Sequence, residues 1–179
     1  RVGVPSAFAG PSEVVVIADA SAPVAFAAVD VVVQAEHGPD GLAWLVTWDE
    51  EVADAVEAEI AAVAEASPRR ADIEATLAVA GHTVLVDGPA QALAVADLIA
   101  PEHLQLMVEG AEEVAARVRH AGAVFCGPWS PASLGDYMAG PSHVLPTAGT
   151  ARFSGALTVA DFTKDLHVVT AGSDAIADL

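Results

Sequence analysis

The chain has 179 residues and a mass of 18.1 kDa, and its 25 acidic and 7 basic side chains give a formal net charge of −18. This length suits one domain or part of a larger one, and an apolar fraction of 54% supplies enough material for a core and excludes a disordered chain. No apolar run approaches the roughly 20 residues of a membrane helix, and so strong a negative charge without a basic stripe argues against a nucleic-acid partner.

The first half of the chain alternates continuous apolar runs with helical patterns. Short β-branched runs are typical of strands buried on both faces, and apolar residues at helical spacing indicate the helices between them. Asp49 is a good N-cap, because an aspartate accepts the unpaired N–H groups of a first helical turn, and Ser67 and Pro68 end that helix. The predicted elements are a strand over 13–18, a helix over 24–34, a strand over 42–48 and a helix that follows Asp49 as far as Ala66.

The same alternation continues to residue 126 and then breaks down. Residues 127–147 are rich in Gly, Pro and Ser, and a long irregular segment in a compact domain is usually functional. Helices of about ten residues between strands favour parallel βαβ units, and therefore a three-layer α/β fold with a mostly parallel sheet and helices on both faces. The predicted elements are helices over 71–80, 90–99 and 111–120, and strands over 82–86, 104–108, 123–126 and 166–170.

Four polar clusters lie in the connections between these predicted elements. In an open parallel sheet, ligands bind beyond the carboxyl ends of the strands, so we take polar residues of such loops as candidates for a site. The clusters are 10–13, 34–38, 101–104, and 135–137 together with His143.

Gln34 and His37 form a first candidate pair, three residues apart at the end of a predicted helix. Side chains at this spacing project from one helix face, and an imidazole nitrogen and an amide oxygen are plausible zinc ligands, with Asp136 as a third. A structural interpretation stands beside this one, because the helix dipole favours a histidine near a helix C-terminus that is followed by Gly38. The spacing alone favours the structural interpretation.

Glu102 and His103 form a second candidate pair, between a helix-ending proline and an apolar strand. Adjacent Glu and His can act as a general acid/base couple because imidazole titrates near neutrality, and a capped turn with an exposed carboxylate is an equally good interpretation. Ser12 is a candidate nucleophile, but the nucleophile-elbow pattern is absent, so a turn serine before the strand is the simpler interpretation. The sequence contains no dinucleotide-binding or P-loop fingerprint.

Five motifs in order and spacing connect these clusters. They are AGPSEV at 9–14, QAEHGPD at 34–40, SPRR at 67–70, APEHLQL at 100–106 and GDYMAGPSHVLPT at 135–147. Together they resemble the histidinol dehydrogenase family, zinc- and NAD-dependent enzymes that complete histidine biosynthesis. Each motif alone is weak, but five in register over nearly the whole chain are specific. The resemblance implies an aldehyde dehydrogenase/histidinol dehydrogenase-like α/β fold.

The resemblance also implies roles for the candidate residues. The implied zinc ligands are Gln34, His37 and Asp136, the implied catalytic pair is Glu102 and His103, and the implied substrate contacts are Ser12, Gln34, His37, His103, Asp136 and His143. In the family, zinc holds the amino alcohol L-histidinol through its amine and imidazole nitrogens and stays redox-inert. NAD accepts the hydride of two successive oxidations, alcohol to aldehyde and hydrated aldehyde to acid. His103 would take the hydroxyl proton, and Glu102 would activate the water that attacks the aldehyde.

The resemblance further implies how the chain is divided. Residues 1–157 would be the latter half of the main α/β catalytic domain, and 158–179 the start of a C-terminal segment. The family also uses a Glu and a zinc-ligating His that reach the site of the partner subunit in a homodimer, and a Rossmann-like domain with most NAD contacts. This chain matches neither part, and it starts at Arg1 rather than Met. We therefore expect upstream residues, and little turnover by this chain alone.

Three alternatives stay open at the level of the sequence. A relative in the same family would oxidise a different small alcohol with the same zinc and Glu–His pair. A fragment or pseudoenzyme domain would keep the fold without activity. A zinc hydrolase would use Glu102 as its base, but it leaves the GPSE and GDY motifs unexplained. The single cysteine, Cys126, and the lack of a secretory-type leader lead us to expect a reducing cytoplasm.

Overall fold

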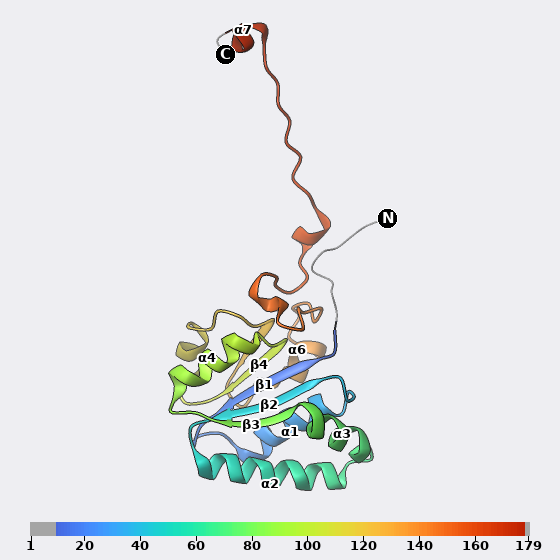
Figure 1. Cartoon of the computed structure of the whole chain (residues 1–179), viewed down its shortest axis with the longest axis vertical. Helices are drawn as coiled ribbons and strands as arrows, with labels where there is room; N and C mark the ends of the chain where they lie inside the picture. Colours follow the sequence, from blue (N-terminus) through green and yellow to red (C-terminus); the bar gives the residue numbers. More distant parts are fainter. Residues whose placement is uncertain (1–9, 178–179) are drawn as a thin grey trace.

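The computed structural model describes residues 10–177, and these are organised around a five-stranded, fully parallel sheet (Figure 1). The strands are β1 (Glu13–Ala18), β2 (Leu42–Thr47), β3 (Gly81–Leu85), β4 (His103–Met107) and β5 (Ala123–Cys126). Their order is β3-β2-β1-β4-β5, so the chain builds outward from β1 to β3 and then returns to place β4 on the other side of β1. The predicted α/β fold with a parallel sheet is therefore confirmed.

Helices cover both faces of this sheet. They are α1 (Val24–Ala35), α2 (Glu50–Ala66), α3 (Arg70–Ala80), α4 (Pro89–Ile99), α5 (Ala111–Ala115), α6 (Ala132–Tyr137) and α7 (Ser173–Ala177), with 3-10 helices η1 (Thr150–Arg152) and η2 (Val159–Phe162). Apolar residues of α1, α2 and α3 pack on one face, and those of α4 and α5 on the other. This follows from the change of direction after β3, because right-handed crossovers that run in opposite directions place their helices on opposite faces. In the part of the chain that the structure describes, every helix falls short of the length and apolarity of a bilayer span.

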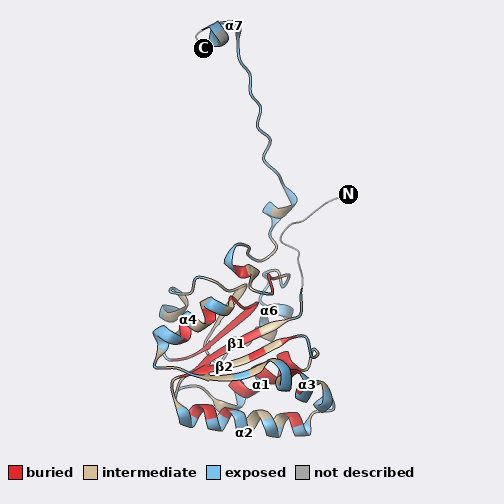
Figure 2. Cartoon of the chain, viewed as in Figure 1, coloured by how far each residue is buried: buried red, intermediate tan, exposed pale blue. Residues whose placement is uncertain are grey.

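The core lies on both sides of β1, the central strand. Val14 and Val16 pack against α1, whereas Val15 and Ile17 pack against α4, and none of the four is more than 1% exposed. Successive side chains of a strand point to opposite faces, so one β-branched run can fill two cores. Figure 2 shows this burial along β1 and β2. The interpretation of 13–18 as a strand buried on both faces is confirmed.

The helix predicted over 111–120 is shorter than expected and ends at Ala115. The side chain of Asp97, on α4, accepts the backbone N–H groups of Arg119 at 2.9 Å and His120 at 3.0 Å. These hydrogen bonds replace helical ones and hold the end of the segment as a turn. The missing part of the helix is therefore explained by a tertiary contact that no local pattern contains.

The prediction of a strand over 166–170 is wrong. Within the described residues, the extended segment 163–172 pairs with no strand, and Leu166, Val168 and Val169 are 78%, 79% and 89% exposed. Figure 1 shows this segment leaving the domain, with α7 far from the sheet. The local preference for extended backbone is real, but a strand also needs a neighbour that supplies its hydrogen bonds.

The irregular segment after β5 returns across the sheet, and it contains α6, where no helix was expected. Its start is held by Gln105, a fully buried residue of β4, whose Nε2 donates to the carbonyl oxygen of Gly127 at 2.9 Å. Its far part is held by Glu13, whose carboxylate accepts the N–H of Ala148 at 3.0 Å. The return brings α6 and residues 141–149 to the places where β1 and β4 begin.

The proposed boundary between residues 157 and 158 stays a prediction. The N–H of Leu157 still donates to the carbonyl oxygen of Val144 at 3.0 Å, and beyond it the chain leaves the domain through η2 (Figure 1). The structure does not describe residues 1–9 of the first proposed part or residues 178–179 of the second. The first residue of the AGPSEV motif is among them.

Candidate active site

The four polar clusters meet at the amino-terminal edge of the sheet. Ser12 immediately precedes β1, His103 is the first residue of β4, and 34–38 lead from α1 toward β2. The register pairs Val14 with His103, so the starts of β1 and β4 are neighbours. The expectation of a site beyond the carboxyl ends is therefore wrong. The returning segment 127–149 closes over the opposite edge and forms the site there.

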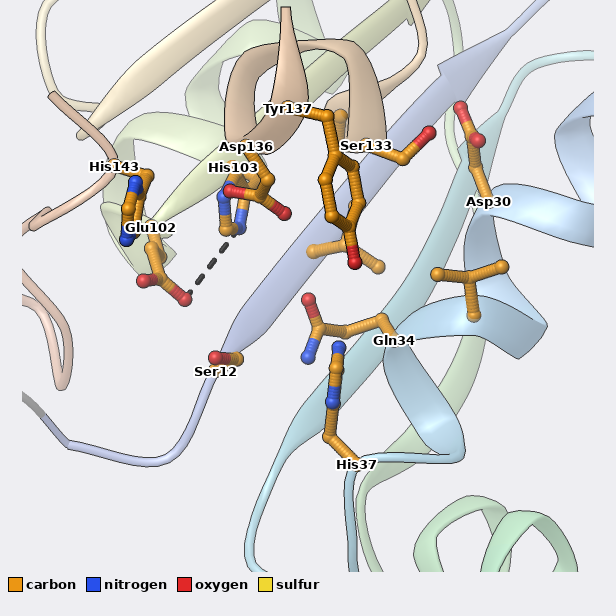
Figure 3. A pocket seen from close by; sticks show the side chains of 13 residues that line it. Ser12, Asp30, Gln34, His37, Glu102, His103, Ser133, Asp136, Tyr137 and His143 are labelled. Atoms are coloured by element: carbon orange, nitrogen blue, oxygen red, sulfur yellow. Dashed lines mark ion pairs between the residues drawn. The ribbon is translucent and has the colours of Figure 1, made fainter. Parts of the chain in front are cut away.

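A cavity of about 370 Å³ opens at this edge between β1, α1 and α6 (Figure 3). Every residue singled out in the sequence lines it, namely Ser12, Gln34, His37, Glu102, His103, Asp136 and His143. Asp30, Ser133 and Tyr137 line the same cavity. Five separate stretches of the chain thus contribute polar side chains to one space, which is the arrangement expected of a binding or catalytic site.

His103 is held with one ring nitrogen already occupied. Its Nδ1 lies 3.0 Å from the backbone carbonyl oxygen of Glu13, and because a carbonyl only accepts, Nδ1 carries the hydrogen of the neutral ring. The side chain is only 8% exposed, and its ring centre lies 6.0 Å from that of Phe125. The lone pair is therefore on Nε2, on a ring whose orientation is fixed, as a general base requires.

Glu102 is buried beside this ring, with Oε2 3.4 Å from Nδ1 of His103 and 3.0 Å from the backbone N of Glu13, which donates to it. Burial raises the pKa of Glu102 and the negative charge of Asp136 adds to this, whereas His103, the N–H of Glu13 and the Ser12 side chain lower it. The net direction of the pKa of Glu102 is upward, because burial outweighs the groups that lower it. The alternative of an exposed carboxylate on a turn is wrong, since the residue is 7% exposed.

Glu13 organises the site, although the sequence analysis gave it no role of its own within the polar cluster 10–13. Its carboxylate accepts the backbone N–H groups of Glu102 at 3.2 Å and Ala148 at 3.0 Å, and its own N–H binds Glu102 in return. Burial raises the pKa of Glu13, and these two N–H groups oppose the shift. One side chain thus joins the starts of β1 and β4 to the returning segment. A charged residue opening an otherwise apolar strand is the signal that could have identified it.

Gln34 and His37 lie where α1 ends. Gln34 is 6% exposed, and its Nε2 has no hydrogen-bond partner within residues 10–177. This end of the helix is fixed by Thr76 of α3, whose hydroxyl donates to the carbonyl oxygen of Ala35 at 2.8 Å, and Gly38, at φ +136°, turns the chain toward β2. A buried amide with unused hydrogen-bonding capacity is costly unless a ligand completes it.

Asp136 reaches the cavity from α6 on the opposite side (Figure 3). This helix approaches β5 closely because Gly135 lacks a side chain: a Cβ there would lie 2.8 Å from Cζ of Phe125. The same Phe125 ring lies beside His103, so one aromatic side chain positions both residues. His143, further along the returning segment, lines the cavity from an exposed position.

The donor set fits zinc by residue type. Within the described range 10–177, no three His, Cys, Asp or Glu side chains lie close enough to hold a metal ion by themselves. His37 and Asp136 supply an imidazole nitrogen and a carboxylate, and the amide of Gln34, buried with its nitrogen unpaired, is the group that would complete the set. These three side chains would supply fewer than the four ligands of a closed structural zinc site.

Asp30 is a further cavity residue that the sequence analysis missed. It lies one turn before Gln34 on α1, is 9% exposed, and has no partner for Oδ2 among the residues described. Burial raises its pKa to about 6. An aspartate inside an otherwise apolar helix, four residues before a candidate ligand, is the signal that could have found it.

Comparison with known proteins gives the same assignment as the five motifs. A family model described as histidinol dehydrogenase matches residues 2–179. The chain belongs to the histidinol dehydrogenase family. It is 47% identical over 169 residues to the histidinol dehydrogenase of Parasynechococcus marenigrum, and 44% identical over 182 residues to that of Streptomyces avermitilis, alignments that cover 94% and 100% of this chain.

The fold of this chain is also similar to that of a solved histidinol dehydrogenase. The crystal structure of histidinol dehydrogenase from Elizabethkingia anophelis matches with a TM-score of 0.86 and 35% identity over 95% of this chain. The chain spans about two fifths of the length of these histidinol dehydrogenases, namely 38%, 41% and 39%. Both the family resemblance and the histidinol dehydrogenase-like fold expected from the sequence are confirmed.

Proposed function

We propose that this histidinol dehydrogenase family member serves in the oxidation of L-histidinol to L-histidine, the final step of histidine biosynthesis, with zinc and two NAD. The observation that carries the proposal is the convergence of Glu102 and His103 with Gln34, His37 and Asp136 on one cavity. The relatives bear the name of this activity, which supports it.

Gln34, His37 and Asp136 would hold the zinc ion. When bound, zinc would supply a redox-inert Lewis acid that anchors the amine and imidazole nitrogens of the amino alcohol. Ser12 and His143 line the same cavity and contribute further substrate contacts, as does His103. The unpaired amide nitrogen of Gln34 supports this assignment, because it leaves that side chain without a structural partner in the described chain.

His103 acts as the base of the first oxidation. Nε2 takes the hydroxyl proton of the alcohol, and NAD, when bound, would supply the acceptor for the hydride of the same carbon, so that the alcohol becomes the aldehyde. The carbonyl oxygen of Glu13, 3.0 Å from Nδ1, keeps the ring in place and stabilises the imidazolium. Each oxidation releases one proton besides the hydride, so His103 must lose its proton before the second.

Glu102 acts on the second half of the reaction. Its carboxylate accepts a proton from the water that adds to the aldehyde, which gives the hydrate that the second oxidation would convert to the acid. Burial, by raising the pKa of this group, makes the carboxylate a stronger base than an exposed glutamate. The N–H of Glu13 and the side chain of Ser12 orient it.

The proposal extends to the setting of the enzyme. From the family resemblance we propose a cytoplasmic homodimer, with residues 1–157 as the latter half of the main catalytic domain and 158–179 as the start of a C-terminal segment. Residues that bind NAD are not assigned by the motifs.

Zinc binding tests the proposal directly. We expect about one zinc ion per chain in the parent, at least about tenfold weaker zinc affinity in His37→Ala and in Asp136→Ala, and unchanged affinity in His167→Ala, a histidine on the exposed segment 163–172. Zinc affinity is measured by chelator competition, with L-histidinol binding and histidinol-dependent NADH formation followed in parallel. Zinc absent from the parent, or unaffected by both cavity substitutions, would contradict the proposed ligand set.

A further inference from the structure

A second cavity adjoins the catalytic one. It has a volume of about 540 Å³ and lies between α1 and the segment 128–134, with Met107 of β4 also in its lining. We call it the α1–α6 groove. It shares Asp30, Val33 and Ser133 with the catalytic cavity, so the two cavities are neighbours with a common wall.

The walls of the α1–α6 groove are apolar and partly aromatic. Phe26 and Trp129 face each other edge-on, with ring centres 5.6 Å apart at 75°. Trp129 is 80% exposed, and Val29 and Leu134 beside it are 42% and 37% exposed. An exposed indole ring in the lining of an apolar groove offers a stacking surface for a flat ligand.

One charge stands in this apolar surrounding. Asp30 is 9% exposed, and its Oδ2 has no hydrogen-bond partner in residues 10–177. The described residues that line the two cavities include no lysine and no arginine. Because an unpaired buried carboxylate is expensive, its position between the two cavities indicates a ligand that brings a positive charge.

We propose that the α1–α6 groove binds a flat aromatic cation of the pyridinium class, which stacks on Trp129 and pairs with Asp30. The inference rests on the proposed function, because the oxidised nicotinamide ring is a cation of this class. Its charge is lost when it accepts a hydride. Asp30 therefore favours the oxidised cofactor over the reduced one, and helps the reduced ring to leave.

Other positively charged ligands fit the groove less well. A metal ion needs several oxygen or nitrogen ligands, and among the described residues of the groove only Asp30 and Ser133 carry polar side chains. A bare ammonium group would satisfy Asp30 but leave the rings of Phe26 and Trp129 uncovered. A flat cation uses both the charge and the aromatic walls.

The test compares two ring ligands that differ in charge, 1-methylnicotinamide, a cation, and nicotinamide, which is neutral. Their affinities for the 179-residue chain are measured by ligand-observed NMR. We expect the parent to bind the cation at least about tenfold more tightly, and Asp30→Asn to reduce this preference to within about twofold. Asp54→Asn, which removes the same charge from the exposed face of α2, keeps the preference. Trp129→Phe weakens the binding of both rings.

Each other result overturns the inference. It fails if the parent binds neither ring, if it binds both equally, or if the preference for the cation survives in Asp30→Asn. Thermal unfolding of Asp30→Asn shows whether the variant is folded. Zinc and L-histidinol binding by the same variant report on the proposed function separately. If Asp30→Asn still binds zinc and L-histidinol but no longer prefers the cationic ring, both proposals are supported. If the parent chain binds neither zinc nor L-histidinol, the proposed function is contradicted, while the ring-binding result still decides the inference about the groove.

Discussion

Three carboxyl groups in or beside the candidate active-site cavity, those of Glu13, Asp30 and Glu102, have pKa values raised chiefly by burial. Glu13 and Glu102 recover part of this cost through backbone N–H groups, while Asp30 has only its burial. Raised pKa values of this kind gather at functional sites, where reactivity is kept at the expense of stability. At the scale of the residue, a substitution of Asp30 is therefore the clearest way to measure how much stability a buried carboxylate costs.

Replacing Asp30 with asparagine should stabilise the fold near neutral pH. Folding raises the pKa of Asp30 from 3.8 to about 6, so the native state binds the proton more tightly, and stability falls as the pH rises from about 4 to about 6. Because the carboxylate keeps some access to water, we expect Asp30→Asn to raise the free energy of unfolding by about 1–2 kcal/mol at pH 7. The gain should vanish below about pH 4, where Asp30 is protonated in both states. Urea unfolding at several pH values measures this.

Asp54→Asn is the matched control for this experiment, because Asp54 lies on the exposed face of α2. It should change the free energy of unfolding by less than about 0.5 kcal/mol at any of these pH values. A destabilised Asp30→Asn at pH 7 would show that the carboxylate has a partner in solution.

At the scale of the element, α6 shows how a short helix is placed by packing rather than by its own sequence. Its residues give no helical signal, and the helix begins directly after Pro131, whose fixed φ of −65° suits a helix start. Gly135 faces Phe125 so closely that any side chain would collide with the ring. The position of Asp136 in the cavity is therefore set by the close contact between the preceding residue, Gly135, and the ring of Phe125.

Gly135→Ala should move Asp136 without unfolding the domain. The new Cβ would lie 2.8 Å from Phe125, so α6 must shift outward, although alanine is the better helix former. We expect zinc affinity to fall at least about tenfold, with little change in the thermal midpoint. Gly155→Ala, where nothing lies within 4 Å of the added Cβ, should leave zinc affinity unchanged. Equal zinc affinity in the two variants would mean that α6 does not position a ligand.

At the scale of the whole molecule, the parallel domain and the segment that leaves it are energetically separate. The segment 163–172 makes no sheet pairing within the described chain, and its apolar side chains are exposed. Figure 1 shows it extending away from the five strands. Little of the free energy of folding can therefore come from it.

The sequence contains one lysine, Lys164, and it lies in this segment. We expect a lysine-specific protease to cut the folded protein rapidly after Lys164, because exposed extended chain is the preferred substrate of proteases. The product that ends at Lys164 should keep the thermal midpoint of the whole chain within about 2 °C, since about 0.5 kcal/mol corresponds to a shift of this size. Slow cleavage, or a clearly lower midpoint, would show that the segment packs on the domain in solution.

The local hydrophobic pattern predicted most of the fold, because each strand and helix between residues 13 and 126 shows the hydrophobic periodicity of its type. The run at 13–18 is apolar on both faces because β1 is the central strand, and Asp49 does cap α2, accepting the N–H groups of Glu51 and Val52. The pattern failed for the end of the helix predicted over 111–120 and the strand over 166–170. The helix ends early because Asp97, distant in the sequence, binds the N–H groups of Arg119 and His120. The strand does not form because no described strand lies beside the segment.

The sequence by itself determined the family, the parallel α/β fold and seven of the residues that line the candidate cavity, because motif identity and hydrophobic period are local properties of the chain. Only the tertiary structure decided which edge of the sheet holds the site, since that depends on where the segment after β5 returns. It alone revealed Glu13 as the link between β1, β4 and that segment, and Asp30 as an unpaired charge between two cavities. Burial and partners are relations between distant residues, and no local pattern contains them.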